Sequence, residues 1–367
     1  MIGYDWVCLI IPNKMSENRF NKRIKISSEI LAKIARIDEF KGLWRGSINL
    51  NPAILKRLKY TVVITSTGAS TRIEGSKMND AEVARLLRGL KTTPPKNRDE
   101  QEVAGYADLI GRVFDNYKDL KLTENNILHF HGILLNYSAK DQPHKGRYKA
   151  GDNVVAAQNE KGQNVILFKA TPPFLVKKEM EEAIDWTVSE LNKKELHPIL
   201  VIANFIFEFL AIHPFSDGNG RLSRALTNLL LLRANYVYVP YISLDEIIED
   251  TRSEYYIALN ARQNKHKTDS EDITPWLNYF LYTLLTHSDK AHKLMQGEHP
   301  EMLLSGSQEK VLALFLADKA LSISDISEKL HDDASRETTK KILARLVELR
   351  LIQLIGRGRG ARYKRVL

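Results

Sequence analysis

The chain has 367 residues, of which 43% are hydrophobic and 27% are charged. This balance excludes a generally disordered chain and favours a folded protein of two or three domains. Its single cysteine, Cys8, excludes an internal disulfide and a cysteine-based zinc site, and it fits a reducing cytoplasm. An apolar run at 6–12 is too short for a signal peptide or a membrane span, so we expect a cytoplasmic protein without membrane contact.

Helical periodicity dominates the chain, and it predicts a mainly α fold. A connection rich in Pro and Lys at 91–97 marks a domain boundary. Thr123 is a predicted N-cap. Alternating apolar residues around the turn at 159–164 predict a β-hairpin within 146–169. The predicted helices cover residues 24–60, 60–74, 100–116, a segment after Thr123, 176–191, 198–212, 220–234, 249–263 and 274–296.

The C-terminal segment has a different pattern, which predicts a winged helix-turn-helix. Three helices are expected at 309–316, 324–330 and 335–349, followed by two short strands at 352–355 and 362–366. The formal charge of the chain is +9, and much of the excess lies from Ser335 onward. The basic helix, with Arg357, Arg359 and Arg362 on the wing, favours contact with DNA. Interleaved acidic residues equally favour a module that recruits a protein, and both interpretations stay open.

The segment 213–224 combines several groups that phosphate chemistry needs. His213 can accept a proton from a hydroxyl near neutral pH. Asp217 offers a hard oxygen ligand for Mg²⁺. The glycines at 218 and 220 allow a tight turn into a helix whose N-terminus favours an anion. Arg221 and Arg224 share one helical face and can bind further phosphate oxygens.

A glycine-rich turn between two helices is the simpler interpretation of a lone Gly-Asn-Gly. Here the segment matches the motif of the Fic family, H-x-F-x-D/E-G-N-G-R-x-x-R, at every specified position. The chain therefore resembles Fic proteins, over about 97–285. The resemblance implies transfer of AMP from ATP to a Ser, Thr or Tyr hydroxyl of a protein. It also implies an N-terminal helical region at 1–96, a catalytic domain at 97–296 and the winged helix at 297–367.

Residue roles follow from the same resemblance. It implies that His213 is the general base and that Asp217 holds Mg²⁺. Gly218 to Gly220 form the anion hole for the α-phosphate, and both arginines bind the outer phosphates. A tyrosine pair lines the adenine pocket, although aromatic residues on a helix are also typical of a core. The implied nucleotide-binding residues are Gly218, Asn219, Gly220, Arg221, Leu222, Ser223, Arg224, Tyr255, Tyr256 and Gln263.

The hairpin at 146–169 resembles the flap of the family, which positions a target segment by strand addition. We expect the contacting edge near 153–157. Lys149 stands where relatives usually have arginine, so this part departs from the family pattern. His129, His131 and His144 lack a convincing ligand set, and helix packing or solvent exposure is the expected explanation.

Ser70 to Gly75 resembles the inhibitory motif S/T-x-x-x-E-G/N of Fic proteins whose inhibitory helix precedes the core. The segment also fits a helix C-terminus with Gly75 as its left-handed cap. The resemblance implies that Glu74 forms a salt bridge with Arg224, and that Ser70 fixes the helix nearby. Related enzymes can also use this glutamate to orient a water that removes AMP, and both uses stay open.

Competing functions remain at this stage. Some relatives transfer phosphate or phosphocholine, but these usually depart from the Gly-Asn-Gly core that this chain keeps. A nucleotide-sensing regulator that binds DNA is the non-enzymatic alternative. The resemblance further implies a homodimer, whereas the identity of the target protein is not encoded in any motif.

Overall fold

The structure is a computed structural model that describes residues 18–47, 52–158, 164–261, 265–296, 304, 306–315, 320–330, 335–349, 351–356 and 358–366. Predictions that concern Cys8, the apolar run at 6–12, Gln263 and Arg357 lie outside these residues. Within the described part of the chain, no helix has the length and apolarity needed to cross a membrane.

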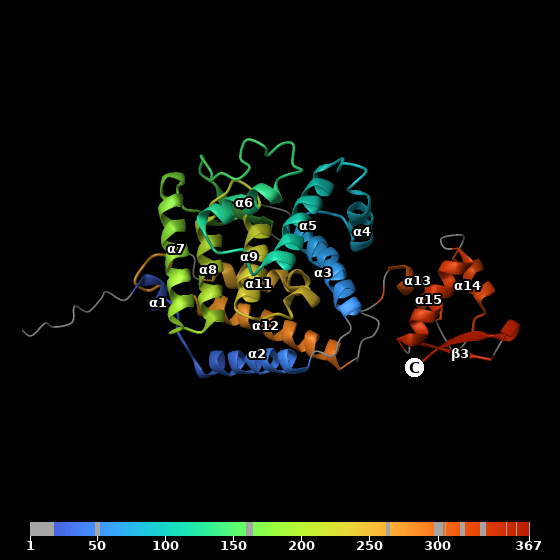
Figure 1. The fold of residues 1–367 in the computed structure, drawn as a ribbon. Helices are drawn as coiled ribbons and strands as arrows, with labels where there is room; N and C mark the ends of the chain where they lie inside the picture. Colours follow the sequence, from blue (N-terminus) through green and yellow to red (C-terminus); the bar gives the residue numbers. More distant parts are fainter. Residues whose placement is uncertain are drawn as a thin grey trace, which may run out of the picture.

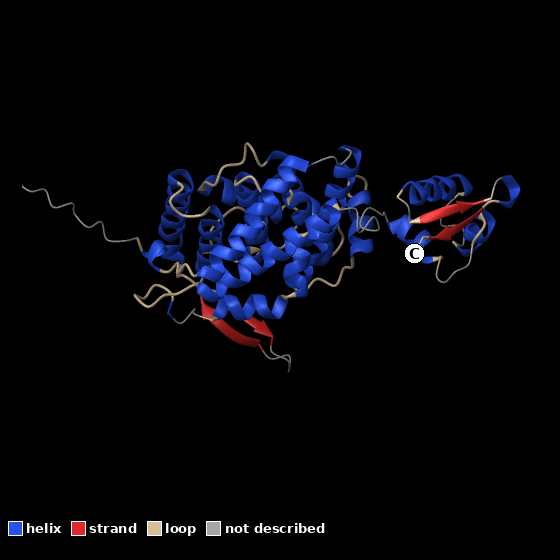
Figure 2. Cartoon of the chain, turned by 90° about the horizontal axis from the view of Figure 1, so that it is seen from below, coloured by secondary structure: helices blue, strands red, loops and turns tan. Residues whose placement is uncertain are grey.

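The described residues are mainly helical, as the sequence predicts (Figures 1 and 2). The first part comprises α1 (Arg19–Lys22), α2 (Ser28–Ser47), α3 (Pro52–Ile73), α4 (Asp80–Gly89), α5 (Arg98–Asn116), α6 (Glu124–Leu134), β1 (Val154–Gln158), β2 (Asn164–Lys169), α7 (Pro173–Lys193), α8 (Pro198–Ile212), α9 (Asn219–Arg233), the 3₁₀ turn η1 (Val239–Tyr241), α10 (Leu244–Asp250), α11 (Arg252–Asn260) and α12 (Thr274–Met295). The last part comprises α13 (Gly306–Ala313), α14 (Ile323–Lys329), α15 (Arg336–Glu348), β3 (Ile352–Ile355), the 3₁₀ turn η4 (Gly358–Gly360) and β4 (Arg362–Arg365).

The helix α8 is the centre of the first part. Every residue from 199 to 212 is buried, so this helix is enclosed on all sides and packs against α7, α9 and α12 (Figure 1). Pro198 occupies the first turn, where its missing N–H has no intrahelical acceptor to lose. A helix enclosed in this way is a rigid support for the loop that follows its C-terminus.

The N-terminal helices share this core. Trp44 of α2 and Val62 of α3 belong to the same buried cluster as the residues of α8. The helix α2 packs on α12, and α3 packs on α5 and α10. The described N-terminal helices and the helices that follow them therefore share one core.

Several predicted boundaries were wrong. The boundary between the two helices expected at 24–60 and 60–74 lies earlier than residue 60, because α2 ends at Ser47 and α3 runs from Pro52 to Ile73. The helix α4 was missed, although Asn79 and Glu82 form a capping box at its start. The helix expected at 249–263 is two helices, which meet at Thr251.

The predicted hairpin is confirmed as β1 paired with β2 in antiparallel register, with an irregularity between Val155 and Ala156. Its strands begin at Val154, so Tyr148 and Lys149 precede the hairpin instead of lying in it. Figure 2 shows this hairpin as a red ribbon against the helices.

The last part has a second buried cluster, which includes Phe315, Ile326 and Leu343. Its elements follow the predicted order, with three helices before an antiparallel pair, β3 and β4. Leu321 pairs with Tyr363 and adds a bridge to that pair.

Candidate active site

His213 is the residue that ends α8. It adopts a left-handed conformation with φ 51° and ψ 63°, and its N–H donates to the Phe209 carbonyl at 3.0 Å. A residue other than glycine is seldom found in this conformation, and such positions cluster at functional sites. Burial, together with the charge of Lys149, lowers the pKa of His213 to about 4. The imidazole is therefore neutral at physiological pH.

The free nitrogen of this ring can be assigned. The Nδ1 atom lies 3.4 Å from the Leu210 carbonyl oxygen. Because a carbonyl only accepts hydrogen bonds, this contact favours the proton on Nδ1 and leaves the lone pair on Nε2. A neutral imidazole with a bare Nε2 is the form that accepts a proton.

The loop after His213 is held by buried polar groups. The Asn219 side chain accepts from the Phe215 N–H at 2.9 Å and donates to the Phe215 carbonyl at 2.8 Å. Asn153 donates to the same carbonyl at 3.1 Å, and the Lys149 N–H donates to the Pro214 carbonyl at 2.9 Å. Asn219 therefore fixes the loop with its side chain, and only its backbone is available to a ligand.

The loop leads into the N-terminus of α9. Gly218 is the cap residue, with φ 81°, and no side chain caps the helix there. A β-carbon at Gly218 would come within 2.8 Å of the Leu134 side chain, and one at Gly220 would overlap a Glu74 carboxylate oxygen. No side chain caps the first amides of α9, and the helix dipole favours an anion beside them, where the Glu74 carboxylate approaches Gly220.

Leu222 and Ser223 follow in the first turn of α9. Leu222 is buried in the core, and the Ser223 hydroxyl donates to the Gly220 carbonyl at 2.7 Å. Both side chains thus face inward, so a contact between these residues and a ligand would come from their backbone.

Asp217 lies beside this helix end in a network of charges. Its Oδ1 is 3.1 Å from Arg221 and accepts from the Gly218 N–H at 2.6 Å. Burial by itself raises the pKa of Asp217, but Arg221 and the Gly218 N–H outweigh it, so the pKa is lowered. Glu102 pairs with Arg221 at 3.1 Å, and Arg98 approaches Asp217 at 3.4 Å. The Asp217 carboxylate is ionised and about one-third exposed, at 34%.

This carboxylate has the chemistry that Mg²⁺ requires. Magnesium is typically bound by one or two protein carboxylates together with substrate phosphates and water. Asp217 offers such an oxygen next to the open amides of α9, so the residues present fit the ion.

Arg224 is buried, at 3% exposed, and its side chain contacts residues at the C-terminal end of α3. Its guanidinium donates to the Ser70 hydroxyl at 2.7 Å, to the Ser70 carbonyl at 2.9 Å and to Glu74 at 2.8 Å. Gly75 adopts φ 106°, which confirms the predicted cap with positive φ. The structure thus brings Ser70, Glu74 and Arg224 together, as the sequence predicts.

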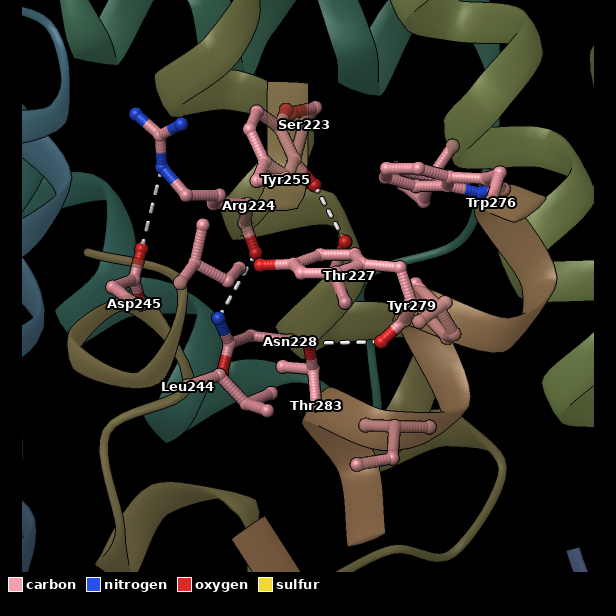
Figure 3. Close-up of a pocket in the computed structure, with 14 residues that line it drawn as sticks. Ser223, Arg224, Thr227, Asn228, Leu244, Asp245, Tyr255, Trp276, Tyr279 and Thr283 are labelled. Atoms are coloured by element: carbon pink, nitrogen blue, oxygen red, sulfur yellow. Dashed lines mark hydrogen bonds and ion pairs between the residues drawn. The ribbon is translucent and has the colours of Figure 1, made fainter. Parts of the chain in front are cut away.

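A second acidic group lies behind Arg224. Asp245 of α10 is fully buried and its Oδ1 is 3.6 Å from Arg224, as the dashed line in Figure 3 shows. Tyr106 donates to the same oxygen at 2.7 Å. Burial raises the pKa of Asp245, and the charge of Arg224 opposes this. No motif in the sequence pointed to Asp245.

The two tyrosines of the predicted pair, Tyr255 and Tyr256, differ in their burial. Tyr255 is 4% exposed and its ring lies 5.8 Å from both Trp276 and Tyr279, so it is a core residue (Figure 3). It faces a largely enclosed cavity of about 20 Å³, which holds about one water and no nucleotide base. Tyr256 is half-buried and is the member of the pair with an accessible side.

A further acidic group consists of Glu208, His266 and Glu271, whose ligand atoms lie within 4.8 Å of one another. Arg23 already pairs with both carboxylates, at 2.5 Å and 2.9 Å, and Arg19 pairs with Glu208 at 2.7 Å. This group is therefore a neutralised ion network that fastens the α1 segment to α8, and it does not need a metal.

Sequence reasoning missed several residues that hold this site. They are far from the motif in sequence and reach it from α5, α6, α10 and the segment before β1. His131 packs in the interior, as one of its two expected explanations had it, and it is also hydrogen-bonded to the loop at 213–219. The missed residues are Arg98, Glu102, His131, Lys149 and Asp245.

Fold and site together define a mainly helical protein in which the loop between two buried helices presents a neutral histidine, a carboxylate and an open helix N-terminus. Residues 121–231 match the family model described as the Fic/DOC family. The chain is therefore similar to the Fic/DOC family over this segment.

Curated relatives show the same similarity. The chain is 28% identical over 229 residues to "Protein adenylyltransferase Fic" of Drosophila willistoni, which covers 61% of this chain and 41% of that protein. It is 25% identical over 251 residues to "Protein adenylyltransferase fic-1" of Caenorhabditis elegans, covering 66% and 42%. The matched region thus spans about two-fifths of the length of these curated relatives.

Solved structures agree in fold. A Fic family protein from Desulfovibrio desulfuricans G20 superposes with a TM-score of 0.61 and 25% identity, over 94% of this chain and 98% of that one. Fic-1 of C. elegans superposes with a TM-score of 0.56 and 20% identity, over 73% and 72%. The first of these likenesses extends over nearly the whole chain.

Proposed function

We propose that this chain is a protein adenylyltransferase, which transfers AMP from ATP to a Ser, Thr or Tyr hydroxyl of a protein. The observation that carries the proposal is the convergence of His213, Asp217 and Arg224 on the open N-terminus of α9. The names of the relatives point to the same activity.

The reaction follows from the placement of these groups. The target oxygen attacks the α-phosphorus of ATP, and the bond between that phosphorus and the oxygen bridging to the β-phosphate breaks. His213 Nε2 takes the hydroxyl proton, and pyrophosphate leaves. The amides at the start of α9 face the charge that develops on the α-phosphate oxygens, where preorganised donors contribute most. Arg221 and Arg224 would bind the outer phosphates.

Mg²⁺ would be held by Asp217 together with the phosphates of ATP. When bound, the ion neutralises charge on the phosphates and on the leaving pyrophosphate. The ion pairs that Asp217 makes with Arg221 and Arg98 keep its carboxylate ionised and oriented. Tyr256 is our candidate for the adenine contact, because Tyr255 faces the core.

The contact between Glu74 and Arg224 supports a built-in brake. Arg224 cannot bind a phosphate while its guanidinium is paired with this carboxylate, at 2.8 Å. The carboxylate also lies over Gly220, where a negative group competes with a phosphate for the helix N-terminus. Removal of AMP by the same glutamate is the alternative use of this group.

The target segment would bind along the β1–β2 hairpin. Asn153 is hydrogen-bonded to Lys149 and to the Phe215 carbonyl of the loop. The strand edge with which a target segment could pair therefore begins at Val154. Strand addition there would bring a target hydroxyl toward the loop.

Mass spectrometry of modified protein tests the proposed reaction. Wild type, Glu74→Gly and Glu74→Gly/His213→Ala are incubated with ATP and Mg²⁺, in the presence of cell lysate. We expect an AMP adduct that is strongest in Glu74→Gly and absent in the double variant. A phosphate adduct, or an adduct that persists without His213, contradicts the proposal.

We also propose that the C-terminal unit binds duplex DNA through α15. Arg336, Lys340 and Lys341 are exposed on this helix, and such cations bind phosphates with strong salt dependence. The test is anisotropy of a labelled duplex between low and high salt, with Lys340→Ala/Lys341→Ala as the variant. Weaker binding and a shallower salt dependence of the variant are expected. Absence of binding at low salt leaves a protein-recruiting module.

A further inference from the structure

His131 is a fully buried residue of α6 that lies outside the 213–224 motif. Three groups surround its imidazole ring. Nε2 lies 3.1 Å from the Asp217 carbonyl oxygen, and Nδ1 lies 3.1 Å from the Gly146 N–H. The ring stacks on Phe215 with a centroid distance of 3.8 Å and an interplanar angle of 15°.

These partners select one form of the ring. The Gly146 N–H can only donate, so Nδ1 must accept and carries no proton. The Asp217 carbonyl can only accept, so Nε2 must carry the proton. The neutral tautomer with its proton on Nε2 satisfies both contacts, and neither the other tautomer nor the imidazolium does.

The contact with Asp217 has a consequence for the neighbouring amide. In a planar trans peptide, the carbonyl and the following N–H point in opposite directions. The Asp217 carbonyl points inward to His131, so the Gly218 N–H points outward, where it donates to the Asp217 carboxylate at 2.6 Å. Gly218 has φ 81° and accepts either sign of φ, so sterics alone do not fix this peptide plane.

We infer that His131 is a positioning residue that fixes the peptide plane between Asp217 and Gly218. It thereby orients the carboxylate assigned to the metal and the first amide assigned to the phosphate. His131 touches no reacting atom, so it is not a catalytic residue. The structural part of the inference stands on the contacts above, and its consequence for AMP transfer rests on the proposed function.

Two substitutions separate the two hydrogen bonds. The amide nitrogen of glutamine reaches roughly the position of Nε2, so His131→Gln retains a donor to the Asp217 carbonyl. The amide oxygen of asparagine lies roughly at Nδ1, so His131→Asn retains the acceptor for Gly146 and loses that donor. Both variants lose the ring that stacks on Phe215. His129→Asn, at an exposed position of the same helix, is the matched control.

The first measurement is hydrogen exchange of the amides in 213–221 in full-length, nucleotide-free protein. We expect His131→Asn to exchange roughly tenfold faster at Gly218 and Asn219, since one hydrogen bond has been removed. His131→Gln and His129→Asn should stay within about twofold of the parent. If His131→Asn and His131→Gln accelerate exchange equally, or if His131→Gln accelerates it more, the inference is overturned. Packing or the contact with the Gly146 N–H would then account for the effect of substituting His131.

The second measurement uses the Glu74→Gly background and titrates Mg²⁺ in the AMP-transfer assay. His131→Asn should raise the Mg²⁺ concentration for half-maximal rate several-fold, and His131→Gln should not. If Glu74→Gly transfers no AMP, the proposed function fails while hydrogen exchange still decides the role of His131. Should either variant not fold, nitrogen NMR of the wild-type ring decides, and a proton on Nδ1 overturns the inference.

Discussion

The brake gives the most direct test of the site, through the substitution Glu74→Gly. Arg224 is 3% exposed and Glu74 is 32% exposed, and the two charges meet at 2.8 Å. A hydrogen bond to a charged group contributes about 1.5–3 kcal/mol, whereas exposed ion pairs contribute about 0–1 kcal/mol. Since one-third of the Glu74 side chain is in water, we take about 1–2 kcal/mol for the contact that must break before Arg224 binds a phosphate.

A barrier lowered by that amount corresponds to a rate of AMP transfer roughly 5- to 30-fold above wild type. The fold should survive the change, because Arg224 keeps its hydrogen bonds to Ser70 and its approach to Asp245. We therefore expect the free energy of unfolding to fall by no more than the about 1–2 kcal/mol taken for the lost contact.

The assay is the initial rate of auto-modification with ATP labelled in the α-phosphate, alongside a separate measurement of ATP affinity. Glu74→Gln keeps the shape of the side chain without its charge and should give an intermediate rate. Glu39→Gln removes a charge from an exposed position on α2 and should behave as wild type. If Glu74→Gly binds ATP as tightly as wild type but transfers AMP no faster, the brake does not exist.

The remaining predictions concern the base, the metal ligand, acid stability and the second core. His213→Ala should lower the rate at saturating ATP by at least about 100-fold with ATP affinity retained, and binding and single-turnover assays together check this. Asp217→Asn should raise the Mg²⁺ concentration for half-maximal rate more than about tenfold, and an unchanged Mg²⁺ titration would exclude this ligand. Burial lowers the pKa of His131, His213 and His287 to about 4, so the unfolded chain, with histidine pKa near 6.5, binds extra protons as the pH falls below that value. The free energy of unfolding should therefore drop by about 4 kcal/mol between pH 7.5 and 5.5 in urea titrations, and a rise would contradict the sign. Leu343→Ala should destabilise the C-terminal unit by about 2–4 kcal/mol and leave AMP transfer unchanged, because Leu343 belongs to the second core alone. Proteolysis measures the stability of the unit, and the transfer assay measures the activity. A loss of AMP transfer would show that the two cores are coupled.

Much of the architecture could be predicted because its signals are local. The apolar run 198–212 predicts a buried helix with the bounds that α8 has, and alternation predicts the β1–β2 pair. The boundary between the first two long helices was wrong, because the periodicity of 24–60 is shared by two helices that pack on different partners, α2 on α12 and α3 on α5 and α10.

The sequence by itself also determined the chemical groups of the 213–224 segment, because these residues are contiguous and their spacing fixes which of them share a helix face. It further indicated the pairing of Glu74 with Arg224, through the resemblance of a second short motif. The structure places these two charges in contact.

Only the tertiary structure decided how that segment is held. His131, Lys149 and Asp245 reach the loop or its arginine from separate elements, and each contact depends on how those elements pack. Packing likewise placed Tyr255 in the core and turned the Asn219 side chain into the loop. Residues that react can be read from a contiguous pattern, whereas residues that position them are scattered along the chain and meet only when it folds.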